Sequence, residues 1–381
     1  MGKSLKIPAY QLVLLIVGSR LMQAYTYLPL ISGTSYNQDA WISCILSIVY
    51  SIIVCFPILF LMNKFRNIEF SEVLNMIMGT IVGKIIAGLI ALFFIFLSIT
   101  WLMVAIIFIN SYLFDELPSW IIVVLVGVPI IYIATSGLTT LGRIAAIVVP
   151  FAILTVIVFA ILGINKMDLH ELQPILADST FMDINGGAFL TAARLSDILI
   201  IFVVYHYLTD RKKINKVFGF SLIIFTTLFV VMVISVITVL GVQYARISWN
   251  PYYTFTRQVE LFEFIQRVES LNALAWFVTT ILNMALINFV TSFILQRIFN
   301  LKSHKKFVLP LVLLSAVVAL LPFLNRTTIV DTIKSTDVYP WVTLLFIFAL
   351  PFAVLLVYFF RKKSIDKKVK QKEREPNPGI A

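Results

Sequence analysis

Ten apolar runs, each long enough to cross a lipid bilayer as a helix, constrain this chain more than any other feature. A helix needs about 20 apolar residues to span the hydrocarbon core. We therefore expect an all-α polytopic membrane protein with ten transmembrane helices in one domain, residues 1–364. The runs lie near residues 9–32, 40–62, 84–113, 119–135, 142–164, 188–208, 216–242, 269–298, 307–325 and 339–360.

The composition supports the membrane class and argues against nucleic-acid binding. Hydrophobic residues make up 60% of the 381 and charged residues only 13%, so a water-soluble fold would expose too much apolar surface. The net charge of +11 is compatible with a nucleic-acid partner. However, the basic residues lie in short loops and in the C-terminal tail rather than on one folded face. We expect lipid contact and no nucleic acid.

The loops between the runs predict the orientation of the chain. With the N-terminus in the cytoplasm, 22 of the 30 Lys and Arg residues fall on the cytoplasmic side and six outside, while Arg20 and Arg194 lie inside runs. Loops rich in Lys and Arg stay in the cytoplasm. Both termini are therefore expected to be cytoplasmic.

Ten helices divide into two halves of five, and an odd number per half inverts the second half relative to the first. Inverted repeats are a recurrent transporter architecture with a ligand site between the repeats. Repeat one would cover about residues 9–164 and repeat two about residues 188–360. The first helices of the two repeats are also the two that carry charges deep in the apolar run.

Those deep charges are the strongest indication of a site. Ala188–Leu208 has 21 residues and contains Arg194 and Asp197, one helical turn apart on one face. An ionised side chain at the bilayer centre costs roughly 2.5–3.5 kcal/mol, so neither should face lipid. Arg20 has the same depth in the first helix, and we expect Arg20 and Asp197 to meet near the midplane.

Polar neighbours extend the candidate site along two helices. Gln23 and Tyr27 share a helical face with Arg20, and Ser19 adjoins that face. On the eighth helix, Thr280 and Asn283 lie on one stripe. A zwitterionic ligand would suit this set, with a guanidinium for its carboxylate and a carboxylate for its amine. The alternative is a structural Arg–Asp–Arg cluster that joins two helices, with the eighth-helix polar groups bonding between helices. Arg194 is also long enough to reach the membrane surface.

Helix-breaking residues favour a discontinuous first helix. Pro29 lies near its outer end, and Gly18-Ser19 forms a flexible pair near its middle. The sixth run has no proline and only Gly186-Gly187 at its outer end, so its continuity stays open.

Two segments are not expected to span the membrane. Residues 251–266 carry apolar side chains at steps of three and four after Pro251, which predicts a helix lying on the outer surface. Residues 365–381 are basic and hydrophilic, which predicts a disordered cytoplasmic tail.

Catalytic and cofactor motifs are missing from the sequence. We find no phosphate-binding glycine loop and no clustered Cys or His ligands, and His170, His206 and His304 are scattered. We expect no enzyme activity, no metal and no cofactor, which leaves a binding site.

Several stretches resemble the spore germination permeases, the B subunits of nutrient germinant receptors. They are Gln11 to Pro29, Asp39-Ala40-Trp41, Gly79 to Lys84 and, most specifically, Pro251 to Phe277, which reads PYYTFTRQVELFEFIQRVESLNALAWF. The similarity covers about residues 5–360.

The resemblance implies the amino acid–polyamine–organocation transporter fold, which is LeuT-like. It also implies recognition of a nutrient, typically an amino acid, in the spore inner membrane beside two other subunits, a membrane A subunit and a lipoprotein C subunit. In that superfamily the main chain at the first-helix break binds the ligand carboxylate, and Gly18, Ser19 and Arg20 occupy that place here. Arg20 departs from the small or apolar residue expected there.

Three functions stay open from the sequence. The first is a sensor that binds a nutrient and signals without sustained transport. The second is an amino acid transporter coupled to protons through Asp197. The third is a structural membrane anchor for a complex.

Overall fold

The computed structural model describes residues 6–26, 28, 38–177, 179–259, 267–321, 327–328, 331 and 338–374. Apart from one isolated parallel bridge between Ile7 and Leu208, the regular structure in these residues is helical. The longer helices are α1 (Ala9–Thr26), α3 (Ala40–Lys64), α4 (Phe70–Met78), α5 (Thr80–Tyr112), α6 (Ser119–Ser136), α7 (Leu138–Leu162), α8 (Phe181–Ala192), α9 (Asp197–Val204), α10 (Ile214–Ile247), α11 (Pro251–Gln258), α12 (Glu269–Ile298), α13 (Lys305–Leu320), α15 (Tyr339–Leu344) and α16 (Leu350–Arg374).

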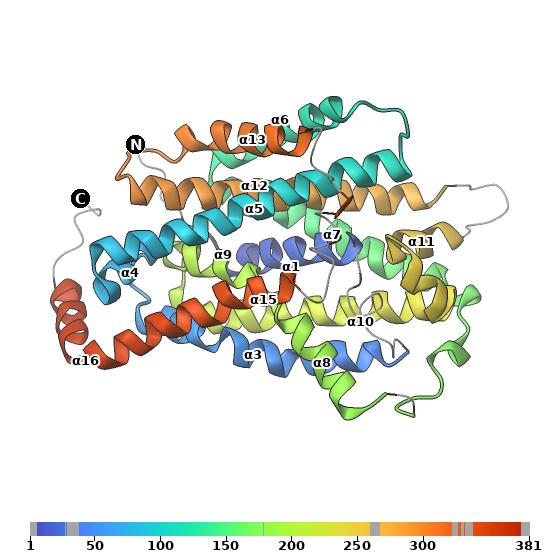
Figure 1. Cartoon of the computed structure of the whole chain (residues 1–381), viewed down its shortest axis with the longest axis horizontal. Helices are drawn as coiled ribbons and strands as arrows, with labels where there is room; N and C mark the ends of the chain where they lie inside the picture. Colours follow the sequence, from blue (N-terminus) through green and yellow to red (C-terminus); the bar gives the residue numbers. More distant parts are fainter. Residues whose placement is uncertain are drawn as a thin grey trace.

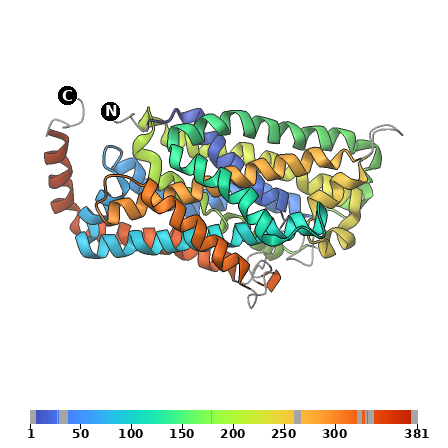
Figure 2. The same cartoon turned by 90° about the horizontal axis from the view of Figure 1, so that it is seen from above.

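Most helices lie side by side along one direction and form an elongated bundle (Figures 1 and 2). Among the described residues, eight helical segments are long and apolar enough to cross a membrane. The multi-pass all-helical class is therefore confirmed. The expected runs at 9–32 and 307–325 correspond to α1 and α13, whose described parts have 18 and 16 residues.

The centre of the bundle is α1, which packs against α7, α10 and α12. Most of its residues are buried, including Ser19 and Arg20 with their polar side chains. By contrast, α3, α5, α6 and α13 each leave large apolar side chains exposed on their outer faces, as Ile52 and Phe56 do on α3. A helix with such a face is suited to lipid, so the bundle is built as a membrane domain around a polar central helix.

One helix was not expected from the sequence. α4 is a short helix that precedes α5, and Gly79 separates the two with φ of 88°. Its buried side chains include Phe70, Val73, Leu74 and Ile77. Their spacing is amphipathic, but the segment is too short to produce a spanning hydropathy signal.

The C-terminal residues differ from the expected disordered tail. α16 continues to Arg374, and its last turns run across the end of the bundle (Figure 1). Ile365 and Val369 are buried one turn apart, and Asp366 pairs with Lys64 at 3.0 Å. The basic sequence can therefore form a helix because one apolar stripe finds a surface on the bundle. Residues 375–381 lie outside the described residues.

A polar network closes the end of the bundle where α1 begins and α16 ends. Arg297 pairs with Glu69, and Tyr207 contacts both by accepting a hydrogen bond from Arg297 at 3.0 Å and donating one to Glu69 at 3.2 Å. The Ile7 amide donates to the Tyr207 carbonyl, and the Thr209 amide donates to the Ile7 carbonyl, both at 2.9 Å. We call this set the inner network.

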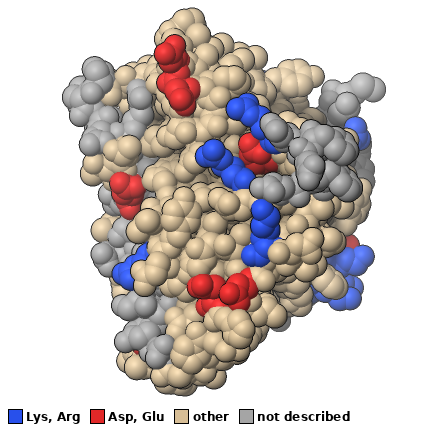
Figure 3. Space-filling view, turned by 90° about the vertical axis from the view of Figure 1, so that its right-hand side faces the viewer, with Lys and Arg blue, Asp and Glu red and all other residues tan. Residues whose placement is uncertain are grey.

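The opposite end carries acidic and basic side chains interspersed (Figure 3). Here α11 folds back onto the bundle. Its N-terminus is capped by Asn250, whose side chain accepts from the Tyr253 amide, and Pro251 occupies its first turn, as expected. However, α11 ends at Gln258, and Tyr252 and Phe255 are buried against the bundle. Residues 260–266, which the expected surface helix included, lie outside the described residues.

Candidate ligand-binding site

The sixth expected span is two helices with a break between them. α8 ends at Ala192 and α9 begins at Asp197, and the four residues between them are buried. Tighter turns replace the regular helical hydrogen bonds, because the Arg194 amide donates to Thr191 at 3.3 Å and the Leu195 amide to Ala192 at 3.2 Å. A break at membrane depth needs such internal partners for its backbone groups.

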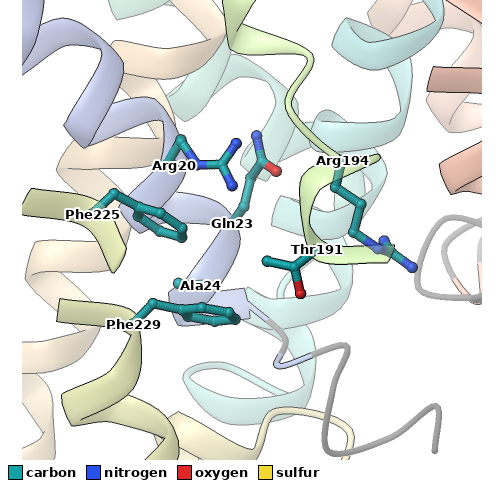
Figure 4. A pocket seen from close by; sticks show the side chains of 7 residues that line it. All are labelled: Arg20, Gln23, Ala24, Thr191, Arg194, Phe225 and Phe229. Carbon is teal, nitrogen blue, oxygen red and sulfur yellow. The ribbon is translucent and has the colours of Figure 1, made fainter. Parts of the chain in front are cut away.

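The break sends the two charged side chains in different directions, so the expected shared face of Arg194 and Asp197 is wrong. Asp197 points toward α1. Arg194 extends away from Arg20 (Figure 4), with its Cζ atom 5.2 Å from the ring centroid of Tyr339 on α15. A continuous helix would have placed both on one face, and the lost regular turn is what separates them.

Arg20 and Asp197 do meet, as expected. The Arg20 Nη1 atom lies 3.5 Å from Asp197 Oδ2, with both side chains below 8% exposed. The Arg20 Cζ atom also lies 4.3 Å from the ring centroid of Phe225 on α10. The pair satisfies the requirement that a buried charge has an opposite charge nearby, and the aromatic face adds a second favourable contact for the cation.

Ser19 links this pair to the eighth expected span. Its hydroxyl contacts Asp197 Oδ1 and lies 2.6 Å from the Asn283 side-chain amide on α12. A hydroxyl has one proton, so two arrangements are possible. With ionised Asp197, Ser19 donates to the carboxylate and cannot also donate to Asn283 Oδ1. With protonated Asp197, the carboxyl donates to Ser19, which donates to the Asn283 amide oxygen.

The expected break in the middle of the first helix is not present. α1 is helical from Ala9 through Thr26, so the main chain at Gly18, Ser19 and Arg20 is committed to helical hydrogen bonds. Gly18 instead allows close packing, because a Cβ atom there would lie 2.6 Å from Val149 Cγ2 on α7. Tyr27 and Pro29 lie outside the described residues.

Two small cavities flank Arg20. The larger, of about 20 Å³, lies toward the α11 end and is shown in Figure 4. The smaller, of about 10 Å³, lies toward the inner network and includes Ile16, Asp197 and Phe218 in its lining. The larger cavity, which we call the outer cavity, has room for about one water molecule. Among the described residues, its lining contains two arginines and no acidic residue: Arg20, Gln23, Ala24, Thr191, Arg194, Phe225 and Phe229.

The outer cavity brings together part of the expected site. Gln23 faces it from α1, whereas Asn283 reaches the ion pair only through Ser19. Thr280 is buried one turn from Asn283 and does not line either cavity. Sequence reasoning missed Phe225 and Phe229, because α10 has an apolar sequence around them and no charge that would single out this face.

Aromatic side chains pack against one another near the α11 end of the bundle. Tyr25 lies with its ring centroid 5.5 Å from that of Tyr252, and its hydroxyl donates to the Ala152 carbonyl at 2.6 Å. Trp276 stacks on Phe108 at 3.9 Å between centroids. Burial raises the pKa of Tyr252 well above that of a free tyrosine, so its hydroxyl stays protonated. These four side chains are buried at the α11 end of the bundle.

Within the described ranges, no three His, Cys, Asp or Glu side chains gather closely enough to hold a metal ion. The charged centre in these residues is the Asp197 carboxylate beside the Arg20 guanidinium.

The arrangement of the helices, with a buried break in one of them, defines a helical membrane protein of the LeuT fold. The structure of MhsT in complex with L-phenylalanine matches with a TM-score of 0.65 and 15% identity, covering 94% of this chain and 99% of that one. The nucleobase-cation-symport-1 family transporter Mhp1, in a closed conformation with bromovinylhydantoin bound, matches with a TM-score of 0.63 and 13% identity, covering 86% and 75%.

Sequence comparison then identifies the family. The family described as spore germination protein matches residues 6–330, so the chain belongs to the spore germination permeases. Spore germination protein YndE of Bacillus subtilis (strain 168) is 22% identical over 94% of this chain and 98% of its own length. Spore germination protein KB of the same organism is 20% identical over 95% and 97%.

Proposed function

We propose that this chain is the nutrient-binding membrane subunit of a spore germinant receptor, and that it binds a small nutrient, an amino acid, between α1 and the α8–α9 break. The observation that carries the proposal is the buried Arg20–Asp197 pair beside the outer cavity. Family membership supplies the link to germination. The fold neighbour bound to L-phenylalanine supports an amino acid as the ligand class.

The small size of the outer cavity indicates how binding would produce a signal. At about 20 Å³ it must enlarge to admit a nutrient. A ligand that binds only the enlarged state shifts the population toward it. The ligand carboxylate would bind Arg20, its amine would compete for Asp197, and the α8–α9 break would permit α8 to move against α1.

The architecture that goes with this function is ten transmembrane helices in one domain, arranged as an inverted repeat. Repeat one runs from α1 to α7 and repeat two from α8 to α16. Both termini are placed in the cytoplasm and the protein in the spore inner membrane. The A subunit and the lipoprotein C subunit are its proposed partners, and Lys- and Arg-rich loops at the inner end support this orientation.

Proton-coupled amino acid transport is the second candidate function. The contact chain from Asp197 through Ser19 to Asn283 favours it, because Ser19 can donate to Asn283 Oδ1 while it accepts the proton of a protonated Asp197 carboxyl group. Uptake of radiolabelled amino acid into vesicles that contain only this chain separates the candidates. A pure sensor gives no accumulation, whereas a transporter accumulates amino acid when the vesicle is given a proton gradient.

Two threonines provide a matched test of the nutrient site. Thr191 lines the outer cavity and donates to the Gly187 carbonyl at 2.9 Å, and Thr291 on α12 donates to the Ile287 carbonyl at 2.8 Å. Both are buried. We expect spores with Thr191→Val to need about tenfold more of an activating amino acid, equivalent to about 1.4 kcal/mol. Thr291→Val should leave the dose–response curve unchanged.

The readout is the loss of optical density of spore suspensions across a panel of single L-amino acids. Equal shifts for both variants would indicate a general packing defect. No shift for Thr191→Val, with protein levels unchanged, would contradict a nutrient in this cavity.

A further inference from the structure

Oxygen-bearing side chains from three helices form a buried cluster around Asp197. The Asp197 carboxylate comes from α9, the Ser19 hydroxyl from α1 and the Asn283 amide from α12, and each residue is at most 2% exposed. Ser19 contacts both of the others. Carboxylate, hydroxyl and amide oxygens are the ligands that hard cations prefer in proteins. We call these three residues the oxygen cluster.

The positive charge beside this cluster is part of the protein. Arg20 directly follows Ser19 in α1, and its guanidinium contacts both Asp197 and the Phe225 ring. A buried carboxylate needs a positive charge close by. Because Arg20 and Ser19 sit on the same rigid helical turn, the charge is held in place without recruitment of an ion from solution.

We propose that the oxygen cluster is a monovalent-cation site whose place beside Asp197 the Arg20 guanidinium takes in the wild-type protein. Two consequences follow. The wild-type protein gains no stability from Na⁺ at this site. Removal of the guanidinium creates a site for a small monovalent cation, with Asp197 and Ser19 as its first ligands and Asn283 adjoining. This inference concerns folding and ion binding, so it stands or falls independently of the nutrient.

The test is the thermal unfolding temperature of the purified protein, measured in NaCl and in choline chloride at equal ionic strength. Choline is too large for the cluster and controls for general salt effects. We expect the wild-type Tm to be equal in the two salts. Arg20→Ala should be less stable in choline, and NaCl or guanidinium chloride at low millimolar concentration should raise its Tm by about 3 °C or more.

The double variant Arg20→Ala/Asp197→Asn is the matched control, because it keeps the space but removes the charge that attracts the cation. It should lose the response to Na⁺ and to guanidinium. Arg20→Lys, which retains a tethered cation, should fold and be insensitive to Na⁺. If Arg20→Ala yields no folded protein, the Tm of Arg20→Lys in the two salts still tests the proposal.

Two results would overturn the proposal. One is a wild-type or Arg20→Lys protein whose Tm rises when Na⁺ replaces choline. The other is a folded Arg20→Ala protein that responds to neither Na⁺ nor guanidinium, or that responds equally with and without the Asp197 charge.

Discussion

Arg20 and Asp197 each lie where the loss of one leaves the other as an uncompensated buried charge. Their separation of 3.5 Å and nearly complete burial make the interaction much less screened than a surface ion pair. Breaking a buried pair by removal of one partner typically destabilises a protein by about 3–5 kcal/mol, whereas removal of both costs less. The two residues should therefore behave as one unit.

We predict that Arg20→Ala and Asp197→Ala each lower the thermal stability strongly and that the double variant recovers most of the loss. The measurement is thermal unfolding of the three purified variants, combined as a double-mutant cycle. Additive losses would show that each charge has an independent partner. If the double variant is stable but no longer responds to nutrient, the pair binds ligand in addition to its structural role.

This meeting was predictable from the sequence, because both charges lie near the middle of apolar spans and neither can face lipid. The direction of Arg194 was not predictable, since it depends on a break of four residues between α8 and α9 that contains no proline. The contribution of Phe225 and Phe229 was hidden as well. An apolar side chain that lines a cavity has the same sequence signature as one that faces lipid or core.

α1 and α7 approach each other closely at Gly18. The side chain of Val149 fills the space that a Cβ atom at position 18 would need. Glycine in the middle of a helix has poor helix propensity, so its presence there fits a packing requirement. The sequence suggested flexibility at this residue, but the structure uses its small size to keep α1 straight against α7.

We predict that Gly18→Ala destabilises the protein by about 1–3 kcal/mol through overpacking. Val149→Ala creates space at the same contact, so the double variant Gly18→Ala/Val149→Ala should be more stable than Gly18→Ala alone. Gly219→Ala on α10 is the control, because no atom lies within 4 Å of a Cβ atom there. A Gly18→Ala protein as stable as the wild type would contradict the close contact.

Among the elements, the long apolar helices follow hydropathy, and their expected positions agree with the structure to within a few residues for α3, α6 and α12. The failures have a common cause. The helical α16 tail and α4 depend on a few apolar residues that find a surface on the bundle, and the α8–α9 break depends on partners from other helices. Tertiary contacts of this kind leave little trace in local composition.

The whole molecule has one end rich in basic residues and one end of mixed charge. At the first end lie the start of α1, the Arg211–Lys213 turn and the end of α16. The positive-inside rule therefore predicts that this end faces the cytoplasm, in agreement with the proposed orientation.

We predict that a reporter enzyme inserted after Lys213 is active only in the cytoplasm and one inserted after Lys166 only outside. The assay compares a cytoplasmic reporter with an exported reporter at both positions. The reverse pattern would overturn the orientation, and two positions on the same side would overturn the proposed ten-helix topology.

The backbone pairing of Ile7 with Tyr207 and Thr209 has a mechanical consequence. These two segments are about 200 residues apart in the sequence. Two backbone hydrogen bonds of 2.9 Å nevertheless join them at one end of α1 and α9. These hydrogen bonds couple the start of α1 to the end of α9. A tilt of α9 that begins at the break would therefore pull on the start of α1. The other end of α1 carries Gln23 and Ala24, so the same movement would reach the outer cavity.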